Sequence, residues 1–203
     1  MIRTSIKLAA AAAGALALTG CALLSTPDPV QTYRFGGPAT AGAADGQTAL
    51  QPVNLRRVEF PEAVEGDKIL GVTGTETAYI AGARWVSPAA DLYMESLENA
   101  FAAQATRVRL IGPRELIRGE RSLDIDIRAF EARYEAPGAV PTVVVTARAR
   151  LLALPDRTVA AERTFTVQQP AAANRVSAIV EAFDIATRDL NTQIVGWTDA
   201  NAG

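Results

Sequence analysis

The strongest constraint on the fold is a run of three strand patterns followed by one long helical pattern. Apolar and polar residues alternate in 122–134 with the period of two expected for a strand with one face in solvent. The segments 142–154 and 158–168 continue with β-branched residues, and the turn sequences Pro137-Gly138 and Pro155-Asp156 separate the three. The pattern therefore predicts an antiparallel meander.

Two helices are predicted beside this meander. Apolar residues recur at helical spacing from about Ala173 to Trp197 and again from Pro88 to about Gln104. Shorter strand patterns cover 50–60, 68–72, 77–86 and 108–111. Amphipathic helices bury their apolar stripe against the apolar face of a sheet, so we predict an α+β fold. Its form is a two-layer sandwich, a mostly antiparallel sheet covered by two helices including the long C-terminal one.

Residues 1–20 have the features of a secretory signal peptide. Arg3 and Lys7 precede an apolar run that is too short to cross the ~30 Å hydrocarbon core of a bilayer as a helix. The run ends in Leu18-Thr19-Gly20-Cys21, which is similar to the bacterial lipobox. In a lipobox, signal peptidase recognises the residues before a cysteine that receives lipid. We therefore predict a mature chain that begins at a lipidated Cys21.

The residues after this cysteine predict where the chain is anchored and how its domain is attached. The resemblance to bacterial lipoproteins implies the outer membrane, facing the periplasm, because Ala22 stands where an aspartate favours the inner membrane. Acyl chains, palmitate among them, would be the anchor. Residues 21–48 are rich in Ala, Gly, Pro, Thr and Ser, which predicts a flexible tether with a short strand at 31–35. The folded domain is predicted at 49–199.

Composition excludes several classes of function. The chain has no histidine, which excludes Ser-His-Asp catalysis and His-ligated zinc, and its single cysteine excludes an intramolecular disulfide. Without residues 1–20, the chain keeps 18 basic and 22 acidic side chains, and this near-neutral balance argues against a nucleic-acid partner. We expect no catalytic residue, no bound metal and no cofactor.

Two local patterns suggest ligand sites and are better explained otherwise. Asp124 and Asp126 fall on one strand face, as a calcium site would require, but Arg128 continues the row and favours a solvated face. The segment Gly71–Thr75 has the glycines of a phosphate-binding loop. It lacks the lysine and the following helix of such a loop, so we interpret it as a turn.

Residues 79–88, Tyr-Ile-Ala-Gly-Ala-Arg-Trp-Val-Ser-Pro, resemble a signature of the ABC-type transport auxiliary lipoprotein family (PqiC-like). The lipobox, the segment Tyr33-Arg34-Phe35 and a strand that ends at Pro61 also match. Tryptophan and arginine are frequent at binding hot spots. The candidate partner-binding residues are Tyr79, Arg84, Trp85 and Pro88. The alternative is structural, with Trp85 packed in the core and Arg84 paired nearby.

The resemblance implies a function that composition cannot indicate. Members of this family accompany MCE-domain proteins with an ABC permease and ATPase, which move lipids between the inner and outer membranes. It therefore implies a non-catalytic auxiliary lipoprotein, and no Walker motif is found here, so a partner would hydrolyse ATP. Phospholipid and a second copy of the chain are further partners that the resemblance leaves open.

Two other functions compete with this one. An assembly or activator lipoprotein would bind an outer-membrane barrel or a cell-wall synthase. A periplasmic hydrolase would need a histidine-free dyad, for instance serine with lysine, and Lys68 is the only lysine after the signal segment.

Overall fold

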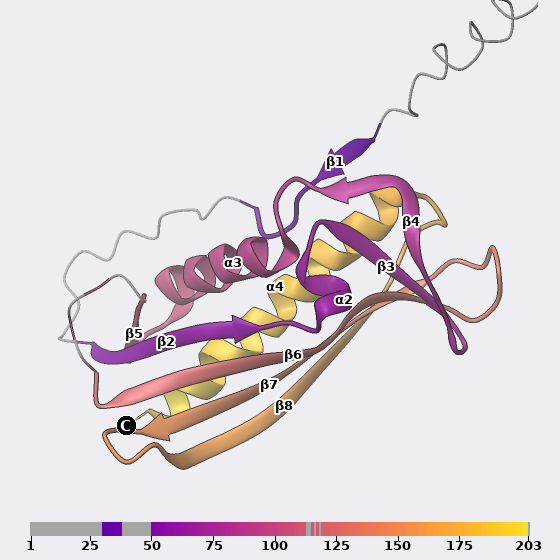
Figure 1. The fold of residues 1–203 in the computed structure, drawn as a ribbon. Helices are drawn as coiled ribbons and strands as arrows, with labels where there is room; N and C mark the ends of the chain where they lie inside the picture. Colours follow the sequence, from indigo (N-terminus) through magenta and orange to yellow (C-terminus); the bar gives the residue numbers. More distant parts are fainter. Residues whose placement is uncertain (1–29, 38–49, 113–114, 116, 118, 203) are drawn as a thin grey trace, which may run out of the picture. The chain divides into compact units, whose positions relative to one another are not determined.

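The computed structural model describes residues 30–37, 50–112, 115, 117 and 119–202. In this part of the chain, eight strands form one sheet, accompanied by three helices (Figure 1). The helices α3 (Ala89–Gln104) and α4 (Val176–Asn201) pack together on one face of the sheet. The predicted two-layer α+β sandwich with a long C-terminal helix is confirmed.

The three long strands form the predicted meander. β6 (Arg121–Tyr134), β7 (Thr142–Ala153) and β8 (Thr158–Pro170) pair in sequence order and antiparallel. α4 packs on β7 and β8. The alternating residues of β7 that face this helix are fully buried, which explains the period-two pattern.

The remaining strands attach to the other side of β6, in two groups. β2 (Gln51–Glu59) runs parallel to the first half of β6, and β5 (Val108–Ile111) lies parallel beyond it. β3 (Lys68–Thr73) runs parallel to the end of β6. The short helix α2 (Glu62–Glu65) connects the two groups.

The group at the end of β6 continues through a hairpin. β4 (Glu76–Trp85) is antiparallel to β3, and β1 (Gln31–Tyr33) is parallel to β4. Gly74 and Thr75 form the two-residue turn between β3 and β4, whereas Gly71–Thr73 belong to β3, so the predicted turn is confirmed only for the last two residues of the segment 71–75.

An aromatic cluster fills the core between this end of the sheet and the helices. The Phe130 ring lies 5.1 Å from Phe35 and 4.8 Å from Phe183, between ring centroids. Trp85 packs edge-on against Phe35 at 4.9 Å and against Phe183 at 5.4 Å. Edge-to-face pairs add to the free energy that burial of the rings alone contributes.

The segment 33–37, which the sequence places within the tether, packs against both long helices. Phe35 is only 1% exposed. The Gly36 N–H donates a hydrogen bond of 2.8 Å to Asp184 Oδ1 on α4. Gly36 has a φ of +66°, and a Cβ there would lie 2.5 Å from the Ser96 Cβ on α3. Only glycine fits this conformation and this space without strain.

The C-terminal end of α4 is tied to the start of β5 by one carboxylate. Asp199 accepts hydrogen bonds from the backbone N–H groups of Thr106, Arg107 and Val108, and from the Thr106 hydroxyl. A buried carboxylate is stable only when it is hydrogen-bonded in this way. The contact fixes α4 relative to the far end of the sheet.

Candidate functional site

The four predicted partner-binding residues lie on β4 and at the start of α3, in different environments. Trp85 is 2% exposed and belongs to the aromatic cluster, so its ring is part of the core. Pro88 is exposed at the N-cap of α3. The structure therefore does not bring the four side chains together on one surface.

Arg84 is held by an ion pair on the surface. Its Nη1 lies 2.9 Å from Oδ2 and 3.1 Å from Oδ1 of Asp67, which directly precedes β3. Both side chains are more than 40% exposed, so the pair is worth only about 0–1 kcal/mol. This is the pairing that the structural alternative described. The partner-binding roles of Arg84 and Trp85 stay predictions.

Tyr79 is the one aromatic member of the set on the surface, with 45% of its area exposed. Its hydroxyl donates a hydrogen bond of 3.1 Å to the carbonyl oxygen of Ala63 in α2. The Lys68 ammonium lies 4.7 Å from the centre of its ring, a cation–π contact. Tyr79 is therefore oriented by two neighbours and still accessible.

A pocket of about 280 Å³ lies beside Tyr79, along the β3–β4 hairpin and the end of β6. The strand registers order its lining: Tyr134, Thr73 and Glu76 form one row across β6, β3 and β4. The next row holds only small residues, Ala132, Gly71 and Ala78. A Cβ at Gly71 would lie 3.3 Å from the Tyr134 ring. Small residues here leave the hollow that the ring flanks.

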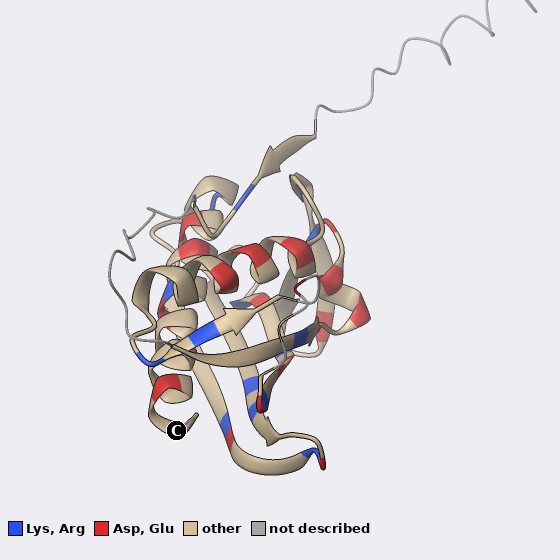
Figure 2. Ribbon diagram, turned by 90° about the vertical axis from the view of Figure 1, so that its left-hand side faces the viewer, with Lys and Arg blue, Asp and Glu red and all other residues tan. Residues whose placement is uncertain are grey.

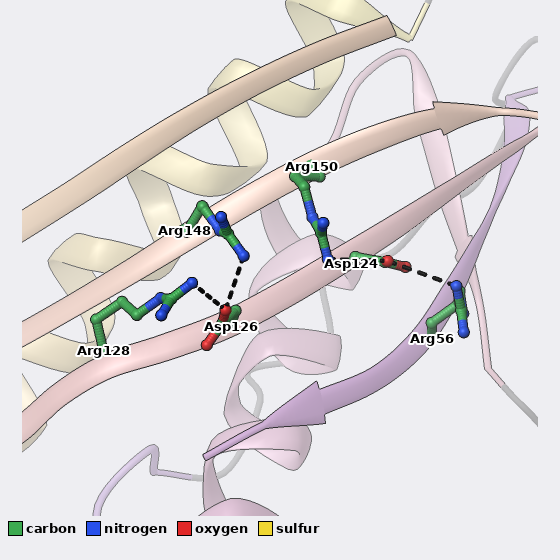
Figure 3. Close-up of polar contacts among 6 residues, drawn as sticks. All are labelled: Arg56, Asp124, Asp126, Arg128, Arg148 and Arg150. Atoms are coloured by element: carbon green, nitrogen blue, oxygen red, sulfur yellow. Dashed lines mark hydrogen bonds and ion pairs between the residues drawn. The ribbon is translucent and has the colours of Figure 1, made fainter. Parts of the chain in front are cut away.

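Arginines and aspartates form a network on the sheet face opposite α3 and α4 (Figures 1 and 3). Asp126 Oδ2 lies 2.6 Å from Arg128 and 3.1 Å from Arg148. Asp124 Oδ2 lies 3.5 Å from Arg56 and 3.6 Å from Arg150. Each carboxylate thus lies between two guanidinium groups that balance its charge, although the buried Asp124 Oδ1 has no hydrogen-bond partner among the described residues.

The surroundings of this network balance its charge. Glu59 lies beside Asp126 and Glu162 beside Arg150 in the strand registers, and both glutamates are exposed. The face therefore carries interleaved charges of both signs, which supports the interpretation of a solvated sheet face over that of a calcium site. Figure 2 shows the contrast with α3, whose charged residues are all acidic.

Two features are absent from the residues that the structure describes. No three Asp, Glu or Cys side chains come together to hold a metal ion there. No helix in those ranges is both long and apolar enough to cross a membrane. Lys68, the lysine that a serine-lysine dyad would need, lies over the Tyr79 ring.

Part of the predicted site lies outside the described residues. The signal segment 1–20, with Leu18, Thr19 and Gly20, the lipidation residue Cys21 and the tether up to residue 29 belong to this part. Sequence reasoning missed the row of Tyr134, Thr73 and Glu76. The two-residue turn at Gly74 and Thr75 was the signal that could have paired Thr73 with Glu76, but the parallel partner on β6 left no local trace.

Comparisons with known proteins agree with this architecture. A family model described as "ABC-type transport auxiliary lipoprotein component" matches residues 33–195. The crystal structure of protein XCC0632 from Xanthomonas campestris is similar at 27% identity and a TM-score of 0.69, over 88% of this chain and 97% of that chain. No curated protein matches the sequence.

Two more distant structures share the fold. An uncharacterized protein is 15% identical with a TM-score of 0.61, over 74% of this chain and 95% of that one. Hypothetical protein CT253 from Chlamydia trachomatis is 10% identical with a TM-score of 0.52, over 75% of this chain and 98% of its own.

Proposed function

The chain belongs to the family of ABC-type transport auxiliary lipoproteins, and from this we propose that it is a non-catalytic component of an intermembrane lipid transporter. Its partners in this proposal are an MCE-domain protein and an ABC permease with its ATPase. The observation that carries the proposal is the family match, which extends from β1 to the last turns of α4.

The anchor in this proposal is lipid on Cys21, in the outer membrane and facing the periplasm. Ten residues lead from Cys21 to Gln31, where β1 begins. A chain of this length reaches at most about 35 Å when fully extended. Because β1 and Phe35 are held in the domain, the domain would stay close to the membrane surface. The anchor therefore favours a docking role near one bilayer.

A catalytic role has little chemical basis in this chain. Proton transfer in hydrolysis needs a base near its nucleophile, and histidine, the commonest base, is missing from the sequence. Lys68 stacks on Tyr79. We therefore assign ATP hydrolysis to the partner, and expect Lys68→Ala to leave function in cells unchanged.

A tagged pull-down from gently solubilised cell envelope, read by mass spectrometry, tests the proposal. We expect to recover an MCE-domain protein with its permease and ATPase. A Cys21→Ser variant is the control for the anchor, since it should leave the membrane fraction. Recovery of an outer-membrane barrel or a cell-wall synthase without the transporter would contradict the proposal and favour an assembly or activator lipoprotein.

A further inference from the structure

The first half of β4 has a free edge. On one side Glu76–Tyr79 and Arg84 pair with β3, with an irregularity at 80–83 between them, and on the other side β1 pairs only with Ala83, Arg84 and Trp85. No described strand lies beside 76–82, and all of these residues except Ile80 are exposed. Gly82, with a φ of +68°, separates this free half from the paired half. The free half therefore presents unpaired backbone groups to solvent.

The hairpin turn identifies which backbone groups point outward. In a two-residue hairpin the flanking residues, here Thr73 and Glu76, form the hydrogen-bonded pair, and the pairs then alternate along the strands. Thr77 and Tyr79 thus direct their N–H and C=O groups away from β3. These are the groups to which an added strand would bind.

This edge is only partly protected against pairing: β4 bulges at 80–83, but the free half has no side chain that blocks an added strand. Natural edge strands carry lysine, proline or inward-pointing charges that prevent the addition of another strand. Residues 77–82, Thr-Ala-Tyr-Ile-Ala-Gly, have no charge and no proline. By contrast, the free edge strand β8 carries Glu162 and Arg163 at its centre and ends in Pro170. The comparison favours β4 as an edge on which another chain can pair.

The pocket beside this edge indicates what the added chain carries. Glu76 forms no ion pair within the described ranges, and the Tyr134 ring flanks the same hollow. The Tyr134 hydroxyl is neutral at physiological pH, and burial raises its pKa further. A carboxylate beside an aromatic ring attracts a cation. Ala78 and Ile80, on the same face of β4, suit apolar side chains.

We propose that an extended segment of a partner protein adds to the free edge of β4 at 76–82, with a basic side chain beside Glu76 and Tyr134 and apolar side chains over Ala78 and Ile80. Main-chain hydrogen bonds would supply affinity, and the pocket would supply specificity. The identity of the partner, a periplasmic part of the transporter, rests on the proposed function. The predicted chemistry of the segment, a basic side chain and apolar side chains, does not depend on the proposed function.

Synthetic peptides test this chemistry directly. The probe is acetyl-KTVTVTK-amide, whose two lysines allow either strand direction, and the matched control is acetyl-ETVTVTE-amide. Binding to the full-length protein is followed by amide chemical shifts. We expect the lysine peptide to bind at least about 5-fold more tightly, with shifts at Thr77 and Tyr79. Glu76→Lys should reverse the preference.

Two variants at one position separate the edge from general folding effects. Thr77→Pro removes an outward N–H without affecting the ladder to β3, and should weaken the lysine peptide by about 10-fold or more. Thr77→Val keeps that N–H and should bind like the wild type. Equal binding by both variants, or no binding of either peptide to the wild type, would overturn the proposal.

The pull-down distinguishes this inference from the proposed function. If wild type and Thr77→Pro recover the transporter equally, the β4 edge is not the docking site and the function stands. If the wild type recovers no transporter, the proposed function is wrong, and the peptide-binding measurement still tests the inference about β4. If Thr77→Pro instead converts a dimer to a monomer in light scattering and the peptides do not bind, the edge joins two copies and the proposal is wrong.

Discussion

The two halves of β4 differ in what lies beside them. Residues 83–85 pair with β1, Arg84 also pairs with Lys68 of β3, and Trp85 enters the core. In the free half, 76–79 pair with β3 alone, and Tyr79 remains accessible. The paired half organises the core. In the proposal above, the free half is the surface that a partner binds, so one motif would serve two purposes within a few residues.

The short strand β1 creates this difference. Its three residues cover only the end of β4, and the chain then turns inward at Phe35 and Gly36. The same segment attaches the domain to the proposed membrane anchor. The core contacts and the proposed attachment thus lie at one end of β4, and the proposed binding edge lies at the other.

The largest expected effect is the loss of the Trp85 ring. Trp85→Ala should lower the free energy of unfolding by about 3–5 kcal/mol, because it leaves a cavity among three aromatic rings. Tyr79→Ala, in the free half, should cost less than about 1 kcal/mol. Urea unfolding measures the free energy lost in each of the two variants. Both are made in the Cys21→Ser chain, which carries no lipid anchor. Equal losses would contradict the division of β4.

The contact between Gly36, which follows β1, and the two long helices gives the next largest effect. Gly36→Ala should cost about 2–4 kcal/mol, since it combines a left-handed backbone with overlap at Ser96. Gly74→Ala is the matched control, because its φ is also positive, at +60°, while a Cβ there meets open space. Its cost should be about 1–2 kcal/mol from the backbone alone. If Gly36→Ala costs no more than Gly74→Ala, the segment 33–37 is not packed as described.

The Tyr93 hydroxyl, on the core side of α3, is a polar group whose removal should stabilise the protein. The Tyr93 hydroxyl is buried and has no hydrogen-bond partner among the described residues. Tyr93→Phe should therefore raise the free energy of unfolding by about 1 kcal/mol at neutral pH. A loss of stability would show that the hydroxyl is satisfied.

The same hydroxyl predicts a pH dependence. Burial raises the pKa of Tyr93 above its ordinary value of 10.0, so the unfolded chain releases this proton first. Below pH 10.0 the hydroxyl is protonated in both the folded and the unfolded chain, so its ionisation does not affect stability. Above pH 10.0 the unfolded chain is stabilised by loss of the proton, so the free energy of unfolding falls as the pH rises. The wild type should lose stability more steeply than Tyr93→Phe in this range, as measured by urea unfolding at increasing pH. Parallel curves would contradict the shift.

The smallest expected effect is at the surface pair of the paired half. Asp67→Asn removes the partner of Arg84 and should change the free energy of unfolding by less than about 1 kcal/mol, because both side chains are more than 40% exposed. Unfolding at high salt should give a still smaller difference between variant and wild type than at low salt, because salt screens an exposed ion pair. A loss above about 2 kcal/mol would give the Arg84–Asp67 pair a structural role beyond that of a surface contact.

The strands and helices were largely predictable because their patterns are local. The alternation around Ile125 predicted β6, and the stripe through Phe183 predicted α4. The helix α2 was missed, since four residues between two strands carry no periodicity. The parallel pairings of β6 with β2 and β3 were also missed, because they join residues far apart in the chain.

The candidate site was predictable only in part, for a related reason. The sequence pointed to Tyr79 and Trp85 as a block, but it could not separate the exposed ring from the buried one. That separation depends on β1, which lies about 50 residues earlier and pairs with one end of β4. The row through Glu76, Thr73 and Tyr134 likewise exists only once three strands are in register.

Hydrogen exchange of backbone amides, measured with and without the co-purified transporter, tests the central claim most directly. The account predicts new protection at 76–82, strongest at Thr77 and Tyr79, and unchanged exchange at 83–88. Protection confined to β8 or to the arginine-aspartate face of β6 and β7, with 76–82 unchanged, would contradict it.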